Sequence, residues 1–156
     1  MVVGIHRYWH ISAYPSTPFT GIAASWYTGS VFGIEHFLHV AEAVLGIDAE
    51  RLMRVTQIPL AESALAAPSA GIAEQQFYEH PVHRAAVLAS RIMRNHPLPD
   101  GNKRVALILM DLYLEENGFR LTASQEEINQ IFRAVAARKH TEDYFVVWLC
   151  SRTERL

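Results

Sequence analysis

The sequence lacks most of the features that mark secreted, membrane-spanning or nucleic-acid-binding proteins. It has one cysteine in 156 residues, so no disulfide can form within the chain, and a reducing compartment is expected. No apolar run approaches the roughly 18 residues that a membrane-spanning helix needs, and Pro15 and Pro18 interrupt what would be the apolar part of a secretory signal. The net charge of −2 supplies no basic field that would attract nucleic acid. We therefore expect a cytoplasmic protein with no membrane partner and no direct nucleic-acid partner.

The single cysteine, Cys150, follows the apolar residues Val146, Val147, Trp148 and Leu149. That setting is typical of a small buried side chain, whereas a reactive thiol needs an accessible, cationic environment. We expect Cys150 to be buried and inert.

Apolar residues are what the chain has in abundance. Half of its residues are hydrophobic and 19% are charged, which indicates a globular and not a disordered protein. A chain of this length is expected to form one domain, which typically buries about 70% of the surface of the unfolded chain.

Apolar residues at helical spacing, with capping residues at the ends, predict six or seven helices. Asp48 and Thr141 suit N-caps, Thr122 and Gln125 suit a capping box, and Gly46 suits a helix end. No segment alternates convincingly as a strand would. We predict an all-α, compact bundle with residues 81–117 as its central helix-loop-helix. The expected helices cover about 34–46, 48–55, 59–68, 81–95, 101–116, 122–135 and 141–149.

Two segments fall outside this helical pattern. Residues 1–30 are rich in aromatic residues and have no sustained period, so a structured extension and a partly ordered arm both remain open. Residues 69–79 form a loop with the pair Phe77-Tyr78, which fits either a flap or docking edge, or a plain connector.

The densest polar cluster lies between the two central helices. Nine consecutive residues hold the imidazole of His96, the carboxylate of Asp100, the amide of Asn102 and the cations of Lys103 and Arg104. Two prolines and a glycine shape the turn, and the prolines stop the first helix near residue 95. We expect the chemistry of the protein here.

The start of the second central helix is an expected anion site. Gly101 permits a turn closed to other residues, and the first amides of the helix, from Asn102 on, have no acceptor within it. Lys103 and Arg104 are cations at the positive end of the helix dipole, where they are unfavourable unless an anion such as a polyphosphate binds. Gly101, Asn102, Lys103 and Arg104 are therefore the candidate phosphate-binding residues.

The remaining groups suit phosphate transfer. Asp100 could hold Mg²⁺ against phosphate oxygens, and His96 could take the proton from an attacking hydroxyl. Arg104 could stabilise charge as a fork, which makes His96, Asp100 and Arg104 the candidate catalytic residues. Taken one at a time, each also has an ordinary explanation, such as an N-cap for Asp100 or a solvated first turn for Arg104.

At these residues the chain resembles the Fic/Doc superfamily, whose pattern is His-x-Phe-x-(Asp/Glu/Asn)-(Gly/Ala)-Asn-x-Arg. Here Leu98 stands in place of the Phe, and we interpret it as the apolar anchor of the loop. The likeness extends from about Ile34 to the last helix, which implies a Fic/Doc-like domain over 31–156 and an N-terminal extension over 1–30. The matching stretch reads His96-Pro97-Leu98-Pro99-Asp100-Gly101-Asn102-Lys103-Arg104.

Within the superfamily the chain looks like the Doc (death-on-curing) branch. Lys103 stands where Fic-type adenylyltransferases have Gly, and Leu107 stands where they have a second Arg. The resemblance implies a toxin that transfers the γ-phosphate of ATP or another nucleoside triphosphate, with Mg²⁺, to a hydroxyl of a target protein, a translation elongation factor. It also implies a separate antitoxin protein, because the segment Thr122–Glu127 departs from the self-inhibiting motif of some Fic proteins.

Two other functions stay open at this point. One is transfer of AMP in place of phosphate, and the other is a silent binding module that keeps the fold. Glu35-His36-x-x-His39 and His80-x-x-His83 also have spacings that would suit a metal site, although exposed or partner-facing histidines are the ordinary explanation. The oligomeric state has no signal in the sequence.

Overall fold

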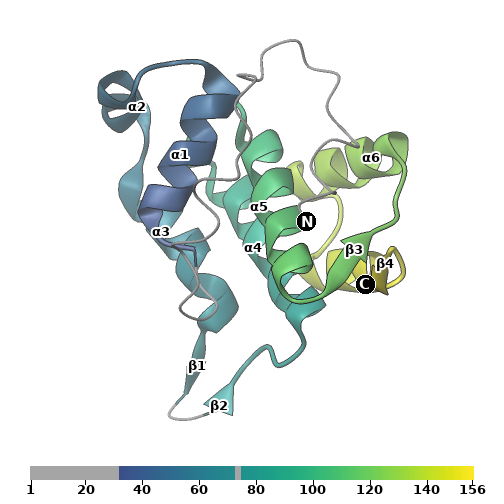
Figure 1. Ribbon diagram of the computed structural model, residues 1–156. Helices are drawn as coiled ribbons and strands as arrows, with labels where there is room; N and C mark the ends of the chain where they lie inside the picture. Colours follow the sequence, from purple (N-terminus) through teal and green to yellow (C-terminus); the bar gives the residue numbers. More distant parts are fainter. Residues whose placement is uncertain (1–31, 73–74) are drawn as a thin grey trace.

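The computed structural model describes residues 32–72 and 75–156, and the prediction for residues 1–30 lies outside this part. The described part is an all-α bundle with a few very short strands, as predicted (Figure 1). In chain order its elements are α1 (Ile34–Leu45), α2 (Ala49–Val55), α3 (Ile58–Ala66), the 3₁₀ turn η3 (Ala67–Ser69), β1 (Gly71–Ile72), β2 (Gln75–Gln76), α4 (Pro81–Asn95), α5 (Asn102–Glu116), β3 (Phe119–Leu121), α6 (Gln125–Ala136), α7 (Glu142–Cys150) and β4 (Thr153–Arg155).

Helix α4 is the centre of the bundle. It contacts α3, α5, α6 and α7, and it lies behind α5 in Figure 1. Three of its alanines, Ala85, Ala86 and Ala89, are fully buried, and these small side chains let neighbouring helices approach closely. Helix α5 buries Val105, Leu109 and much of its remaining surface against α4, so the segment between them is held at both ends by core helices.

Most predicted helix ends are confirmed, and one is wrong. Asp48 accepts a hydrogen bond from the main-chain N–H of Arg51, and Thr141 accepts one from that of Tyr144. Helix α6 is capped by Ser124 with Glu127 and not by Thr122 with Gln125. The Thr122 hydroxyl instead donates to the carbonyl of Arg152 at 2.9 Å, which extends the pairing of β3 with β4.

Two small antiparallel pairs, β1 with β2 and β3 with β4, were not predicted from the sequence. Strands of two or three residues are too short for an alternating pattern to be visible. The β1–β2 hairpin projects from the lower end of the molecule in Figure 1, next to the start of α4. Arg84 of α4 ties its base, because its Nε donates to the carbonyl of Tyr78 at 2.6 Å.

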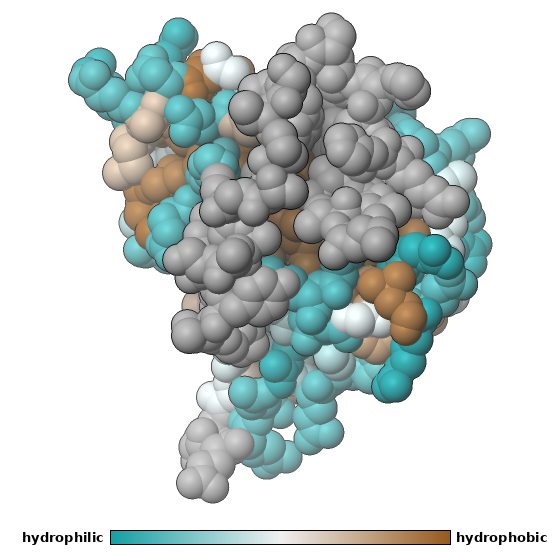
Figure 2. Space-filling view, in the orientation of Figure 1, coloured by the Kyte–Doolittle hydropathy of each residue, from teal (hydrophilic) through white to brown (hydrophobic). Residues whose placement is uncertain are grey.

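The prediction that Cys150 is buried is wrong: its thiol is exposed. Helix α7 turns Phe145 and Leu149 into the core, and the next residue after Leu149 falls on the outer face, together with Val147. Apolar surface also gathers over the α1–α2 side of the molecule (Figure 2), where α2 exposes Met53.

None of the helices in the described ranges has both the length and the apolar character needed to cross a membrane.

An ion pair joins α7 to the central helix. The guanidinium of Arg91 donates to both carboxylate oxygens of Glu142, at 2.8 and 3.0 Å, and Ser90 donates to the same carboxylate. Burial alone would raise the pKa of Glu142, but the hydrogen bonds from Arg91 and Ser90 outweigh it and hold the pKa below its usual range. The carboxylate is therefore charged, and it depends on Arg91 for compensation.

Arg91→Met is expected to lower the free energy of unfolding by about 1–3 kcal/mol, because it leaves a mostly buried carboxylate without its cation. Denaturant unfolding measures the loss. Arg54→Ala is the matched control: its partner Glu50 and Arg54 itself are both more than 70% exposed, so the change should stay within about 0.5 kcal/mol. Equal stability of the Arg91 and Arg54 variants would contradict the conclusion that Glu142 depends on Arg91 for compensation of its charge.

Candidate functional site

The polar cluster predicted from the sequence forms one loop between α4 and α5. His96 is the C-cap of α4 in the left-handed conformation, with φ 53° and ψ 53°, and its N–H donates to the carbonyl of Ile92 at 3.2 Å. Outside glycine this conformation is uncommon, although histidine adopts it more readily than most residues. The chain leaves the helix at His96 and turns into the loop.

Hydrogen bonds to the start of α3 hold the loop in place. The carbonyl of Pro97 accepts a hydrogen bond from the N–H of Gln57 at 2.8 Å, and the side chain of Asn95 donates to the carbonyl of Leu60 at 3.0 Å. Leu98 is 1% exposed and belongs to the core, which confirms its interpretation as an apolar anchor. Sequence reasoning missed Gln57, because a main-chain contact carries no side-chain signature.

Asn102 closes the loop from the other side. Its side chain is buried, and its amide makes two hydrogen bonds to one residue: Oδ1 accepts from the N–H of Leu98 at 3.0 Å, and Nδ2 donates to the carbonyl of Leu98 at 2.8 Å. The same Nδ2 lies 3.1 Å from Nδ1 of His96. The side chain of Asn102 thus organises the loop. Its amide is used in these contacts, so only the main-chain N–H of Asn102, the first of α5, is left to bind a phosphate.

Gly101 occupies a position that other residues would strain. Its φ is +80°, and a Cβ there would lie 3.1 Å from Leu45 and 3.2 Å from Val44. The turn therefore packs tightly on the end of α1. The first main-chain hydrogen bond into α5 runs from Val105 to Gly101 at 3.0 Å, so the amides of residues 102–104 precede it and suit an anion.

The charged side chains surround this helix start. Asp100 keeps its carboxylate 84% exposed, and Arg104 lies 3.4 Å from it. Arg104 also donates to the carbonyl of Val44 at 3.3 Å, at the C-terminal end of α1, where a cation is favourable. Lys103 is exposed. The structure thus brings Asp100, Lys103 and Arg104 together at one helix start, and the ring of His96 lies beside the same start, 3.1 Å from the side chain of Asn102.

These residues fit a magnesium ion held mainly by a nucleotide. Within residues 32–72 and 75–156, no three His, Cys, Asp or Glu side chains are grouped as metal ligands. Asp100 is a single exposed carboxylate beside the N-terminus of α5, and Mg²⁺ is usually bound by one or two carboxylates together with substrate phosphates.

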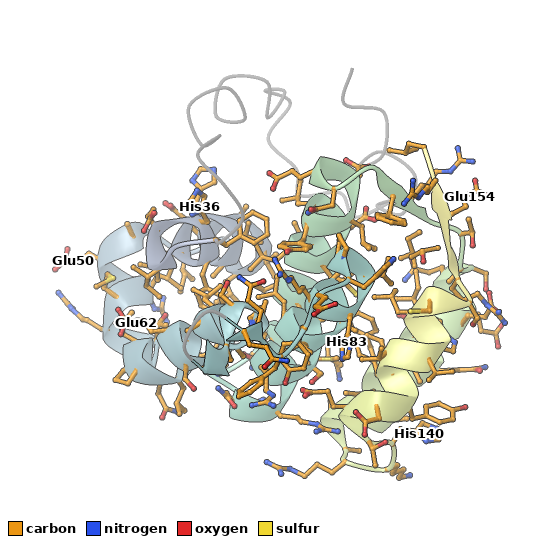
Figure 3. The ribbon with its side chains drawn as sticks, turned by 90° about the horizontal axis from the view of Figure 1, so that it is seen from below. His36, Glu50, Glu62, His83, His140 and Glu154 are labelled. Atoms are coloured by element: carbon orange, nitrogen blue, oxygen red, sulfur yellow. The ribbon has the colours of Figure 1, made fainter. Side chains whose placement is uncertain are left out.

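Three of the four histidines in the two predicted pairs make other contacts in the structure. Nδ1 of His36 accepts from the N–H of Gly33 at 2.8 Å, and Nδ1 of His80 accepts from the N–H of Val82 at 3.2 Å. The ring of His83 packs on Tyr78, with 4.8 Å between centroids. Figure 3 shows His36 and His83 in separate parts of the molecule.

Helix α5 also carries an acidic group that the sequence did not single out. Burial raises the pKa of Asp111 to about 7, with a further contribution from the charge of Glu115 one turn on. Burial likewise raises the pKa of Glu115 and of Glu116. Asp111 lies two helical turns beyond the motif, so its ionisation bears on the stability of α5.

Comparison with known proteins gives two matches. The profile of the Fic/DOC family matches residues 34–114, which include the whole loop and most of α5. The protein "Toxin Doc" of Mycolicibacterium smegmatis (strain ATCC 700084 / mc(2)155) is 35% identical over 71 residues, which cover 46% of this chain and 55% of that protein. The match thus spans about half the length of this relative. No solved structure matches the chain significantly.

Asp111→Asn is expected to stabilise the protein at alkaline pH and to change little at pH 4. The pKa of Asp111 is about 7 in the folded state against 3.8 for an unperturbed aspartate, so the folded state binds the proton more tightly. The cost of ionising it is absent below pH 4, grows from pH 4 to 7 and is complete above. Thermal and urea unfolding at both pH values measure the difference, which should reach about 1–3 kcal/mol above pH 8. An equal effect at both pH values would contradict the raised pKa of Asp111 in the folded state.

Proposed function

The chain belongs to the Fic/DOC family, and we propose that it is a Doc-like toxin that transfers a phosphate from a nucleoside triphosphate to a hydroxyl of a target protein. The observation that carries the proposal is the start of α5. There the left-handed turn at Gly101, three main-chain amides without a partner among the described residues, and the cations of Lys103 and Arg104 support an anion site beside the carboxylate of Asp100.

Each group has a role in this reaction. The amides of residues 102–104, with Lys103 and Arg104, bind the phosphates of ATP or a related nucleotide. Asp100 would hold a Mg²⁺ ion, which supplies charge neutralisation at the phosphates. His96, whose ring lies beside Asn102 at the start of the same helix, takes the proton of the target hydroxyl. Positioning and charge stabilisation account for most of the catalysis in such transfers.

Two positions favour phosphate transfer over AMP transfer. Lys103 adds a cation and bulk at the position where adenylyltransferases of this family have glycine. Leu107, at the position of their second arginine, is 9% exposed and belongs to the core. AMP transfer is the second candidate, because His96, Asp100 and Arg104 would serve it equally well.

The target and the partner follow from the resemblance alone. We propose a translation elongation factor as the target and a separate antitoxin protein as the inhibitor, both in the cytoplasm. The relative from Mycolicibacterium smegmatis carries the name "Toxin Doc", which supports this direction.

Incubation with γ-labelled or α-labelled ATP and a bacterial extract distinguishes the candidates. We expect a protein of the extract to acquire label from the γ position only, and His96→Asn to abolish the transfer. Asn tolerates the left-handed backbone of residue 96 but offers no base, so the variant should fold normally.

Label from the α position alone would replace the kinase proposal with AMP transfer. No transfer from either label, together with growth inhibition that His96→Asn does not relieve, would favour the silent binding module.

Lys103→Ala is expected to raise the KM for the nucleotide by roughly ten- to a hundredfold, the worth of one charge-assisted hydrogen bond to phosphate. Because Lys103 is exposed, stability should change by less than about 0.5 kcal/mol. The chain has one other lysine, Lys139, which is also exposed and lies at the end of α6. Lys139→Ala therefore serves as the matched control, and an equal effect of both variants would argue against a phosphate contact at Lys103.

A further inference from the structure

The contact between Asn102 and His96 defines which nitrogen of His96 carries the proton. The amide nitrogen of Asn102 lies 3.1 Å from Nδ1 of His96. An amide nitrogen donates hydrogen bonds and does not accept them. Nδ1 must therefore offer its lone pair, and the neutral ring carries its hydrogen on Nε2.

The orientation of the Asn102 amide is itself fixed by Leu98. Oδ1 accepts from the N–H of Leu98 and Nδ2 donates to the carbonyl of Leu98, at 3.0 and 2.8 Å. Exchanging oxygen and nitrogen would set two acceptors against each other and two donors against each other. Because Asn102 is 5% exposed, water has little access to relieve such a conflict.

We propose that Asn102 is a positioning residue that fixes His96 in the Nε2–H tautomer and makes Nδ1 its proton-accepting atom. The backbone contributes as well, because the left-handed conformation of residue 96 carries its side chain to Asn102 six residues on. This role differs from a phosphate contact by the Asn102 side chain, whose amide is already committed to Leu98 and His96.

The next step, in which Nδ1 of His96 takes the proton during phosphate transfer, rests on the proposed function. The target oxygen bonds to the γ-phosphorus, the bond from that phosphorus to the nucleoside diphosphate breaks, and the proton of the hydroxyl goes to Nδ1 while Nε2 keeps its own. Since Nδ1 accepts from Asn102 in the free protein, this contact must open before the proton is taken. The histidine is thus held oriented and is released as the target hydroxyl replaces the amide.

Nitrogen-15 NMR of the full-length labelled chain tests the tautomer without any substrate. At about pH 8.5, where imidazoles are neutral, His96 should carry its hydrogen on Nε2, and a coupling should connect its Nδ1 with Nδ2 of Asn102 across the hydrogen bond. His80, whose Nδ1 accepts a main-chain N–H, gives the reference signal for this tautomer in the same spectrum. A hydrogen on Nδ1 of His96 would overturn the proposal.

Asn102→Asp tests the cause, because a carboxylate would accept from Nδ1–H and should move the hydrogen from Nε2 to Nδ1. An unchanged tautomer in the folded variant would show that Asn102 does not set it. If the variant does not fold, the wild-type spectrum still decides.

Kinetics of Asn102→Ala separate positioning from phosphate binding. A positioning role predicts a fall in kcat of about a hundredfold with little change in the KM for nucleotide. A raised KM with unchanged kcat would instead overturn the positioning role. Absence of transfer by the wild-type protein would refute the proposed function and leave the NMR result standing.

Discussion

The bidentate bond between the amide of Asn102 and the main chain of Leu98 is the constraint on which the site depends. The segment between α4 and α5 contains two prolines and must bury Leu98, so the N–H and carbonyl of Leu98 lose contact with water. Buried main-chain groups need partners, and Asn102 supplies both from one side chain. With Leu98 anchored in this way, the side chain of Asn102 also reaches the ring of His96, so the histidine is held beside the start of α5.

The same fold also resolves part of an electrostatic conflict. Cations at the start of a helix oppose its dipole, and α5 begins with Lys103 and Arg104. Arg104 donates to the last turn of α1 at Val44 and lies near Asp100, so its charge is partly compensated within the protein. Lys103 is exposed, and the anion of the proposed function would compensate its charge and pair with the amides of residues 102–104.

Long elements were predicted correctly from the sequence, and very short ones were not. Helices of nine or more residues repeat their apolar positions often enough to be predicted, whereas strands of two or three residues do not. Thr122 and Ser124 both offer a hydroxyl for a cap, and only the pairing of β3 with β4 takes Thr122 away from that role. The error at Cys150 was avoidable, because the helical period that buries Phe145 and Leu149 turns residue 150 outward.

The sequence by itself determined which chemical groups meet at the site, because nine neighbouring residues carry them and local backbone rules stop one helix and start the next. Tertiary structure alone decided how those groups are held. One partner of Arg104 is a carbonyl 60 residues away, and the loop is hydrogen-bonded to the main chain of Gln57. Main-chain atoms are the same in every residue, so such contacts leave no pattern in the sequence. The proposed tautomer of His96 likewise depends on its contact with Asn102. That contact depends on the path of the chain between residues 96 and 102, which only the packed core defines.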